Sequence, residues 1–150
     1  MAITTSYSGA QGWEVTTTAT GSQIAACFAV TPTTSSASIH HIILANNIAN
    51  GCASAGITVH NDGDYGVDYL VVAGNAVYNA AKSRLYCFSG ISVAQLVQTG
   101  SLPGTHIYIA GNVSWDNVAP GPCNSPAPTG CEGIIWIPGT VWTLCLVHMW

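Results

Sequence analysis

DYLVVAGNAVYN, at residues 68–79, is an apolar strand that meets Gly-Asn and then resumes as a second short strand. A β-hairpin uses a similar dipeptide to reverse the chain. Two other segments have the same order of residues, namely four strand-forming residues, then Ala, then Asn or Gly, then Asn. They are HIILANNIAN at 41–50 and HIYIAGNVSWDN at 106–117. Because the dipeptide recurs at one place within a longer repeat, it predicts a corner in a coil that continues in one sense. The alternative is an ordinary hairpin turn in a β-sandwich.

The repeat extends beyond the asparagines. Asn75 lies 28 residues after Asn47, and Asn112 lies 37 residues after Asn75, so the strands recur while the loops grow. Asparagine tolerates the left-handed backbone of a tight corner, and stacked amides can bond to one another and to the backbone. We therefore predict that these three asparagines form a ladder. Each is followed by a loop and a strand that opens with Gly-Ile. These strands read GITV at 56–59, GISV at 90–93 and GIIW at 133–136.

Alternation within the strands predicts which side chains face the core, because successive residues of a strand point to opposite faces. In the strand after each asparagine the pattern is less regular. Ile48 and Val113 follow the asparagine directly, whereas Val77 comes one place later, so the register of that strand stays open. The expected inward pairs are Ile42 and Leu44, Leu70 and Val72, Ile107 and Ile109, Ile57 and Val59, and Ile91 and Val93.

The composition excludes several classes of function. Of 150 residues, 49% are hydrophobic and 5% charged, against about 25% charged in a typical globular protein. The net charge is -4, and Lys82 and Arg84 are the only fixed cations, which argues against a basic nucleic-acid-binding patch. No apolar run has the length of a membrane-spanning helix, so we expect no membrane partner. The first residues show no signal peptide. Together these features indicate a single all-β domain.

The quoted segments resemble the right-handed parallel β-helix of the pectate-lyase-like superfamily, over about 38–136. The resemblance implies an all-β solenoid of about three to four coils. It also implies a secreted protein that acts on or binds a polysaccharide, which includes uronate-containing chains. On this interpretation 1–38 form an N-terminal coil or cap, 39–137 form the coils, and 138–150 are an atypical apolar tail. Because a terminal coil needs a polar cap, that tail suggests a fragment of a longer β-helix.

The resemblance also suggests where a cleft lies, since substrate would run along the Gly-Ile strands between flanking loops. A lyase needs a base that removes a proton next to a carboxylate, and Lys82 or Arg84 in AAKSRLYC is a candidate. Glu132 directly precedes a Gly-Ile strand and is the most cleft-like acid. Each of these residues is equally well explained as a solvated loop or corner side chain.

Aromatic and acidic residues near the same loops supply the other candidates. Asp62 and Asp64, on a Gly-containing loop, suit Ca²⁺, although the distal Glu of an EF-hand loop is missing and a solvated acidic turn is the alternative. Cys52 and two further cysteines precede Gly-Ile strands, which allows a bridge between neighbouring coils. The candidates for stacking on sugar faces, each also suited to a core position, are Tyr65, Tyr86, Tyr108 and Trp115.

Two functions follow from these features. One is a polysaccharide lyase or glycoside hydrolase, with β-elimination assisted by Ca²⁺ as its most concrete form. The other is a non-catalytic carbohydrate-binding or adhesin-like surface module, which the sparse charge favours. The sequence leaves the choice between enzyme and binding module open.

Overall fold

A computed structural model of the chain describes residues 1–17, 25–32, 38–60, 66–82, 89–96, 100–117, 134–138 and 144–146. Within these residues the secondary structure is entirely β. No helix long and apolar enough to cross a membrane occurs among them. The strands are β1 (Ala2–Ile3), β2 (Ser8–Gln11), β3 (Glu14–Thr16), β4 (Phe28–Val30), β5 (Ile39–Ala45), β6 (Ile48–Asn50), β7 (Ile57–His60), β8 (Val67–Ala73), β9 (Ala76–Tyr78), β10 (Ile91–Leu96), β11 (Ile107–Ala110), β12 (Val113–Trp115), β13 (Ile134–Pro138) and β14 (Leu144–Leu146).

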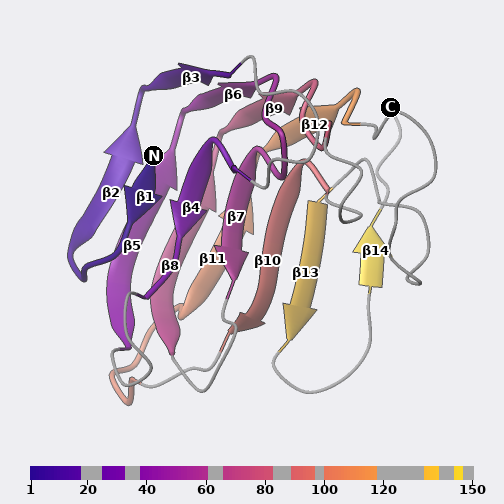
Figure 1. Ribbon diagram of the computed structural model, residues 1–150. Coiled ribbons are helices and arrows are strands. Elements are labelled where there is room, and N and C mark those ends of the chain that lie inside the picture. The colour runs from indigo at the N-terminus through magenta and orange to yellow at the C-terminus, as the bar shows by residue number, and fades with distance from the viewer. Residues whose placement is uncertain are drawn as a thin grey trace.

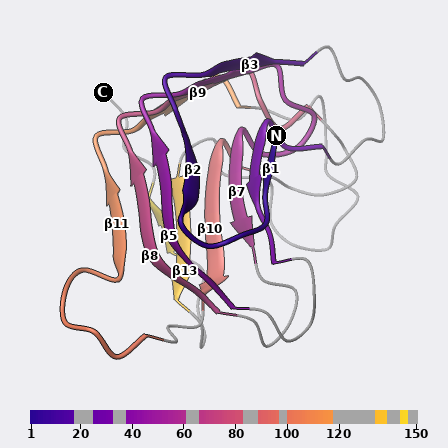
Figure 2. The ribbon, with the colours of Figure 1, turned by 90° about the vertical axis from the view of Figure 1, so that its left-hand side faces the viewer.

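The strands form three sheets around a common core (Figures 1 and 2). Sheet A has the order β1-β4-β7-β10-β13-β14, sheet B the order β11-β8-β5-β2, and sheet C the order β12-β9-β6-β3. Every neighbouring pair is parallel except β13 and β14, which are antiparallel. Each coil adds one strand to each sheet, and four such coils precede β13. The chain is therefore a parallel β-helix, and the coil number agrees with the prediction.

The repeated dipeptide is a corner between sheets B and C. The residue before each ladder position has a left-handed backbone, with φ of 54° at Asn46, 65° at Gly74 and 63° at Gly111. Glycine adopts this conformation at little steric cost, and asparagine is among the side chains that tolerate it best. The left-handed residue is therefore the one before the ladder asparagine, and only at Asn46 is it itself an asparagine. The hairpin alternative is excluded because the strands on either side of each corner, such as β8 and β9, belong to different sheets and do not pair with each other.

The predicted ladder of Asn47, Asn75 and Asn112 is present. The Nδ2 of Asn47 donates to the Oδ1 of Asn75 at 3.0 Å, and the Nδ2 of Asn75 donates to the Oδ1 of Asn112 at 2.8 Å. The backbone N–H of Asn47 and that of Asn75 donate to the same oxygens, each at 3.0 Å. Each amide also donates inward to a carbonyl of sheet B, as the Nδ2 of Asn75 does to the oxygen of Leu44 at 2.9 Å. Asn47 and Asn75 are thus fully buried with their polar groups bonded.

The core follows the predicted alternation. Ile42 and Leu44 of β5 are completely buried, as are their counterparts in β7, β8 and β10, while Ile107 and Ile109 of β11 pack partly buried against the same core. In sheet C the inward residues are Ala49 and Val77, whereas Ile48 and Val113 point out. This settles the register that the sequence left open.

The glycines of the two described Gly-Ile pairs, Gly56 and Gly90, have a steric reason. A Cβ on Gly56 would collide with the side chain of Val77, which points inward from sheet C. A Cβ on Gly90 would likewise collide with Ser114 and Asn117. The interior is narrow where sheets A and C approach each other, and only glycine leaves room there.

A disulfide joins two neighbouring coils near the same corner. Cys27 and Cys52 are bonded, with a Cα–Cα distance of 5.6 Å, and both are fully buried. The sequence placed the possible bridge among Cys52, Cys87 and Cys131, and the structure instead pairs Cys52 with Cys27 of the neighbouring coil. Cys145 lies in β14, and Cys87, Cys123 and Cys131 lie outside the described residues.

Removing the middle amide of the ladder should be costly. Asn75→Ala deletes four hydrogen bonds and leaves the buried N–H of Asn47 without an acceptor, so we expect a loss of about 3 kcal/mol in the free energy of unfolding. Urea unfolding measures it. The matched control is Asn50→Ala, which removes only a 3.5 Å contact with Asn79 and should cost much less. Equal losses in the two variants would contradict a special role for the ladder.

The disulfide should contribute a comparable amount. It links residues 25 positions apart, and loop-closure entropy for that length corresponds to about 3 kcal/mol. We expect the double variant Cys27→Ala and Cys52→Ala to unfold at lower urea concentration by this amount under oxidising conditions. Adding a reductant should destabilise the parent protein and leave the double variant unchanged. A parent protein insensitive to the reductant would contradict the expectation.

Candidate functional site

The predicted catalytic residues are only partly described. Lys82 lies half-buried just after the corner that follows β9, where its backbone N–H donates to the carbonyl of Cys52 at 3.4 Å. Arg84 and Glu132 lie outside the described residues. The described residues therefore do not test whether the proposed base and acid come together, and the catalytic assignment stays a prediction.

The predicted sugar-stacking residues are divided between sheets. Tyr108 points outward from β11 of sheet B and is 50% exposed. Trp115 ends β12 of sheet C, is 43% exposed, and stacks on Tyr78 with ring centroids 4.6 Å apart. Tyr65 and Tyr86 are outside the described residues. Tyr108 and Trp115 belong to different faces and do not share one site.

The predicted cleft face is the outside of sheet A. Its outward row consists of Ala29, Thr58 and Ser92, small side chains that are partly buried. Asp62 and Asp64, the proposed Ca²⁺ ligands, lie in a flanking segment that the structure does not describe. Among the described side chains, no group of three or more His, Cys, Asp or Glu residues is arranged to hold a metal ion.

A column of aromatic rings runs along the other large face. Tyr7, His41, Tyr69 and His106 occupy equivalent positions at the starts of four successive strands of sheet B, and we call them the Tyr/His stack. Successive rings are stacked with centroids 4.8, 4.7 and 4.6 Å apart and interplanar angles of 16°, 21° and 28°. The first three residues have left-handed backbones, with φ of 55°, 57° and 47°. A left-handed backbone is strained for these side chains, and it persists at one repeated position when packing compensates its cost. Here this conformation aligns the rings.

A buried carboxylate holds one end of the stack. Asp68 is completely buried, and its Oδ1 accepts from the Nδ1–H of His106 at 2.7 Å and from the N–H of Tyr69 at 2.9 Å. Its Oδ2 accepts from the N–H of Gly100 at 2.6 Å, and the hydroxyl of Tyr69 donates to the carbonyl of Leu102 at 3.0 Å. Asp68 and Tyr69 therefore clamp the loop before β11 against β8.

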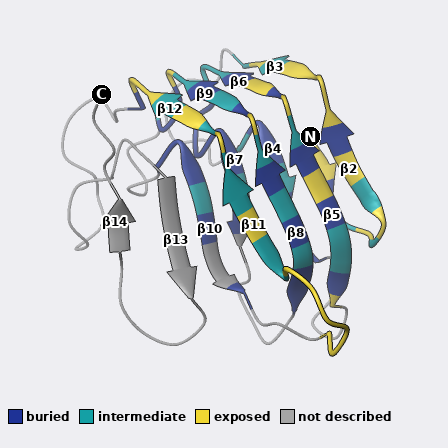
Figure 3. Ribbon diagram, turned by 180° about the vertical axis from the view of Figure 1, so that it is seen from behind, coloured by how far each residue is buried: buried dark blue, intermediate teal, exposed yellow. Residues whose placement is uncertain are grey.

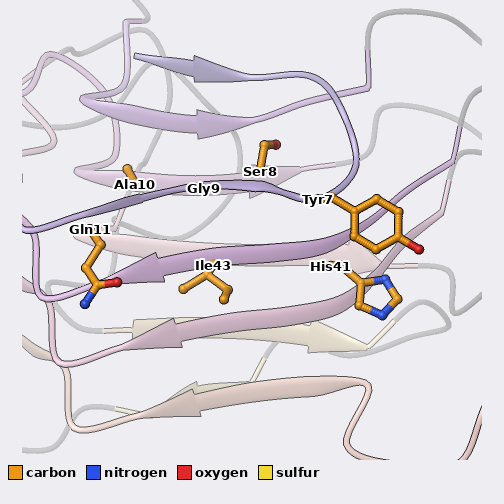
Figure 4. Close-up of a pocket in the computed structure, with 7 residues that line it drawn as sticks. All are labelled: Tyr7, Ser8, Gly9, Ala10, Gln11, His41 and Ile43. Carbon is orange, nitrogen blue, oxygen red and sulfur yellow. The ribbon is translucent and has the colours of Figure 1, made fainter.

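The other end of the stack borders a depression (Figure 4). It has a volume of about 410 Å³ and lies on the outer face of β2 and β5. The rings of Tyr7 and His41 lie at one end, the amide of Gln11 lies at the other, and Ile43 forms one side. Gly9 is exposed between Tyr7 and Gln11, and glycine is required there because a Cβ would collide with the backbone carbonyl of Ile43. We call this feature the Tyr7 depression.

Three properties of the Tyr7 depression matter for binding. Tyr7 is 76% exposed, so the ring face that does not contact His41 is open to solvent. The Nδ1 atoms of His40 and His41 lie 2.8 Å apart, so a hydrogen bond between neighbours holds the His41 ring. The seven lining residues include no Asp, Glu, Lys or Arg. The site can offer an aromatic face, amide hydrogen bonds and apolar contact, and it offers no fixed charge.

Sequence reasoning missed this site because it placed the cleft by analogy. A signal was present, since the repeats begin with His41, Tyr69 and His106 at aligned positions. Tyr7 belongs to the same column, but its segment lacks the Asn motif and was interpreted only as a coil or cap. Comparison with family models, with curated proteins and with solved structures finds no match to the chain.

The Asp68 clamp can be tested by an isosteric change. Asp68→Asn places an amide nitrogen where an oxygen now accepts a hydrogen bond, so one of the three donors loses its partner. We expect faster hydrogen exchange at the Gly100 amide and a loss of about 2 kcal/mol in stability. Asp116→Asn, at an exposed left-handed position, is the matched control and should change neither. Unchanged exchange at Gly100 would rule out the clamp.

Proposed function

We propose that this protein is a non-catalytic carbohydrate-binding β-helix module that recognises an uncharged sugar unit in the Tyr7 depression. One observation carries the proposal, namely that the exposed ring of Tyr7 and the amide of Gln11 lie at opposite ends of an uncharged depression. Aromatic rings stack on the apolar C–H faces of sugars, and amides bond to hydroxyl groups. The depression is larger than a single sugar ring and can admit one with its water shell.

Charge supports a neutral ligand over a uronate. A carboxylate buried without a cation pays a desolvation penalty of several kcal/mol, and no fixed cation lines the depression. The three-sheet coil with its asparagine ladder also supports our proposal that the chain belongs with pectate-lyase-like β-helices, secreted and associated with polysaccharides. The disulfide fits an oxidising compartment. Within that group we assign this domain to binding, because the depression offers an aromatic ring and an amide and is lined by no carboxyl and no fixed cation.

The test is binding to a panel of oligosaccharides by calorimetry. The panel holds neutral glucose, mannose, xylose and N-acetylglucosamine oligomers, together with galacturonate oligomers with and without Ca²⁺. We expect binding to at least one neutral series. Tyr7→Ala and Gln11→Ala should each weaken it about tenfold, equivalent to about 1.4 kcal/mol. Trp13→Ala is the matched control, because Trp13 is 59% exposed in the same coil and does not line the depression.

Two outcomes would contradict the proposal. One is absence of binding to every neutral series. The other is formation of unsaturated products from galacturonate, seen as ultraviolet absorbance, which would favour the lyase. Thermal unfolding of each variant checks that a loss of binding is not a loss of fold, and the exposure of Tyr7 and Gln11 predicts little change.

A further inference from the structure

The outer face of sheet B is organised in three rows that run along the coil axis. Residues point outward at alternate positions, and parallel register places equivalent residues of β2, β5, β8 and β11 side by side. Figure 3 shows this face, on which exposed and partly exposed positions follow one another from strand to strand. The first row is the Tyr/His stack. The second contains Gly9, Ile43, Val71 and Tyr108, and the third contains Gln11, Ala45, Ala73 and Ala110.

The Tyr/His stack is a rigid row on this face. Its rings cover one another's faces along the axis, and the Asp68 clamp fixes the far end through His106. The exposed ring of Tyr7 ends the row and borders the depression. A ligand bound in the depression can extend across the strands over a surface whose side chains are already held in place.

The third row forms an alanine shelf that continues from the depression. Ala45, Ala73 and Ala110 follow Gln11 in register, and none has an atom beyond Cβ. The second row rises beside the shelf, with Ile43 48% exposed and Tyr108 50% exposed. The shelf and this row make a shallow apolar path from the Tyr7 depression to the aromatic ring of Tyr108.

We propose that this path binds an extended, uncharged β-1,4-linked polysaccharide chain, which lies along the coil axis and crosses the strands from the Tyr7 depression to Tyr108. This inference rests on the proposed function and names its ligand class. The three rows contain no Asp, Glu, Lys or Arg, which suits a neutral ligand. Equivalent positions of the path recur at each strand spacing, about 4.8 Å, and an extended β-1,4 chain advances by a similar length with each sugar.

The fold disfavours a peptide in the same place. Strands β5 and β8 are paired on both sides, so their backbone N–H and C=O groups are used within the sheet. A peptide lying across the outer face would have to bury its own backbone groups without partners, which costs free energy. Sugar hydroxyls around an apolar ring face can stay in water while the C–H groups contact the shelf.

The test is the dependence of affinity on chain length. Calorimetry uses β-1,4-linked glucose, mannose and N-acetylglucosamine, from single sugars to hexamers. In the series that binds, we expect affinity to rise until the chain spans the three strand spacings from Tyr7 to Tyr108, about 14 Å, and then to level off. Tyr108→Ala should weaken the longest oligomer about tenfold and leave the single sugar unchanged. Ala73→Gln, which adds a side chain to the shelf, should act in the same way.

The outcomes separate this inference from the proposed function. If Tyr7→Ala weakens binding but the affinity depends neither on chain length nor on Tyr108, the proposed binding module stands and the axial path is overturned. Failure of all three series overturns both. A loss caused by Trp115→Ala, the matched control on sheet C, would place the chain on another face and overturn the path. So would a dimer in sedimentation experiments that Tyr108→Ala dissociates, because the face would then pair two copies.

Discussion

The burial of asparagine amides inside the stack is the constraint on which the rest of the structure depends. Asn47 and Asn75 are almost completely hidden from solvent, and an amide in that position is costly unless each of its groups has a partner. Their partners are the amides of neighbouring coils and the carbonyls of sheet B. A slip of one residue between coils would break these bonds and turn the apolar side chains outward. The ladder therefore determines the register of sheets B and C together.

The narrow interior follows from the same corners. Because sheets B and C meet at a single left-handed residue, side chains from sheet C reach close to the start of the sheet A strands. Glycine at positions 56 and 90 and alanine at position 49 accommodate this closeness. The large residues Ile42, Leu70 and Ile57 fill the wider part between sheets A and B. The surface of this fold consists of strands and turns. Such a surface is rich in Thr, Asn, Ser and Gly and therefore needs few charged residues.

That uncharged surface has a functional consequence. Stacking of coils repeats each outward position along the axis, so a ring at the start of one strand lies over the ring of the next. The fold thereby provides a rigid, periodic face without spending conformational entropy on binding, which is an advantage for weak contacts with a repetitive ligand. Glycine at one position of the periodic face lets β2 approach the backbone of β5 beside the Tyr7 depression, and alanines at three others leave the shelf low.

The sequence by itself determined the coil, the ladder and the inward faces, because these depend on local periodicity and on an asparagine that recurs beside a corner. It did not determine which residues gather on each outer face, since that depends on residues distant in sequence that coil stacking brings together. Register alone brings Tyr7 next to His41. It also brings Gly100 and His106 to Asp68, and it places Cys27 beside Cys52. Loop lengths between coils vary, so the pairing of these positions cannot be counted from the sequence. Only the packed coils decide it, because register is set by buried hydrogen bonds and side-chain volume rather than by spacing along the chain.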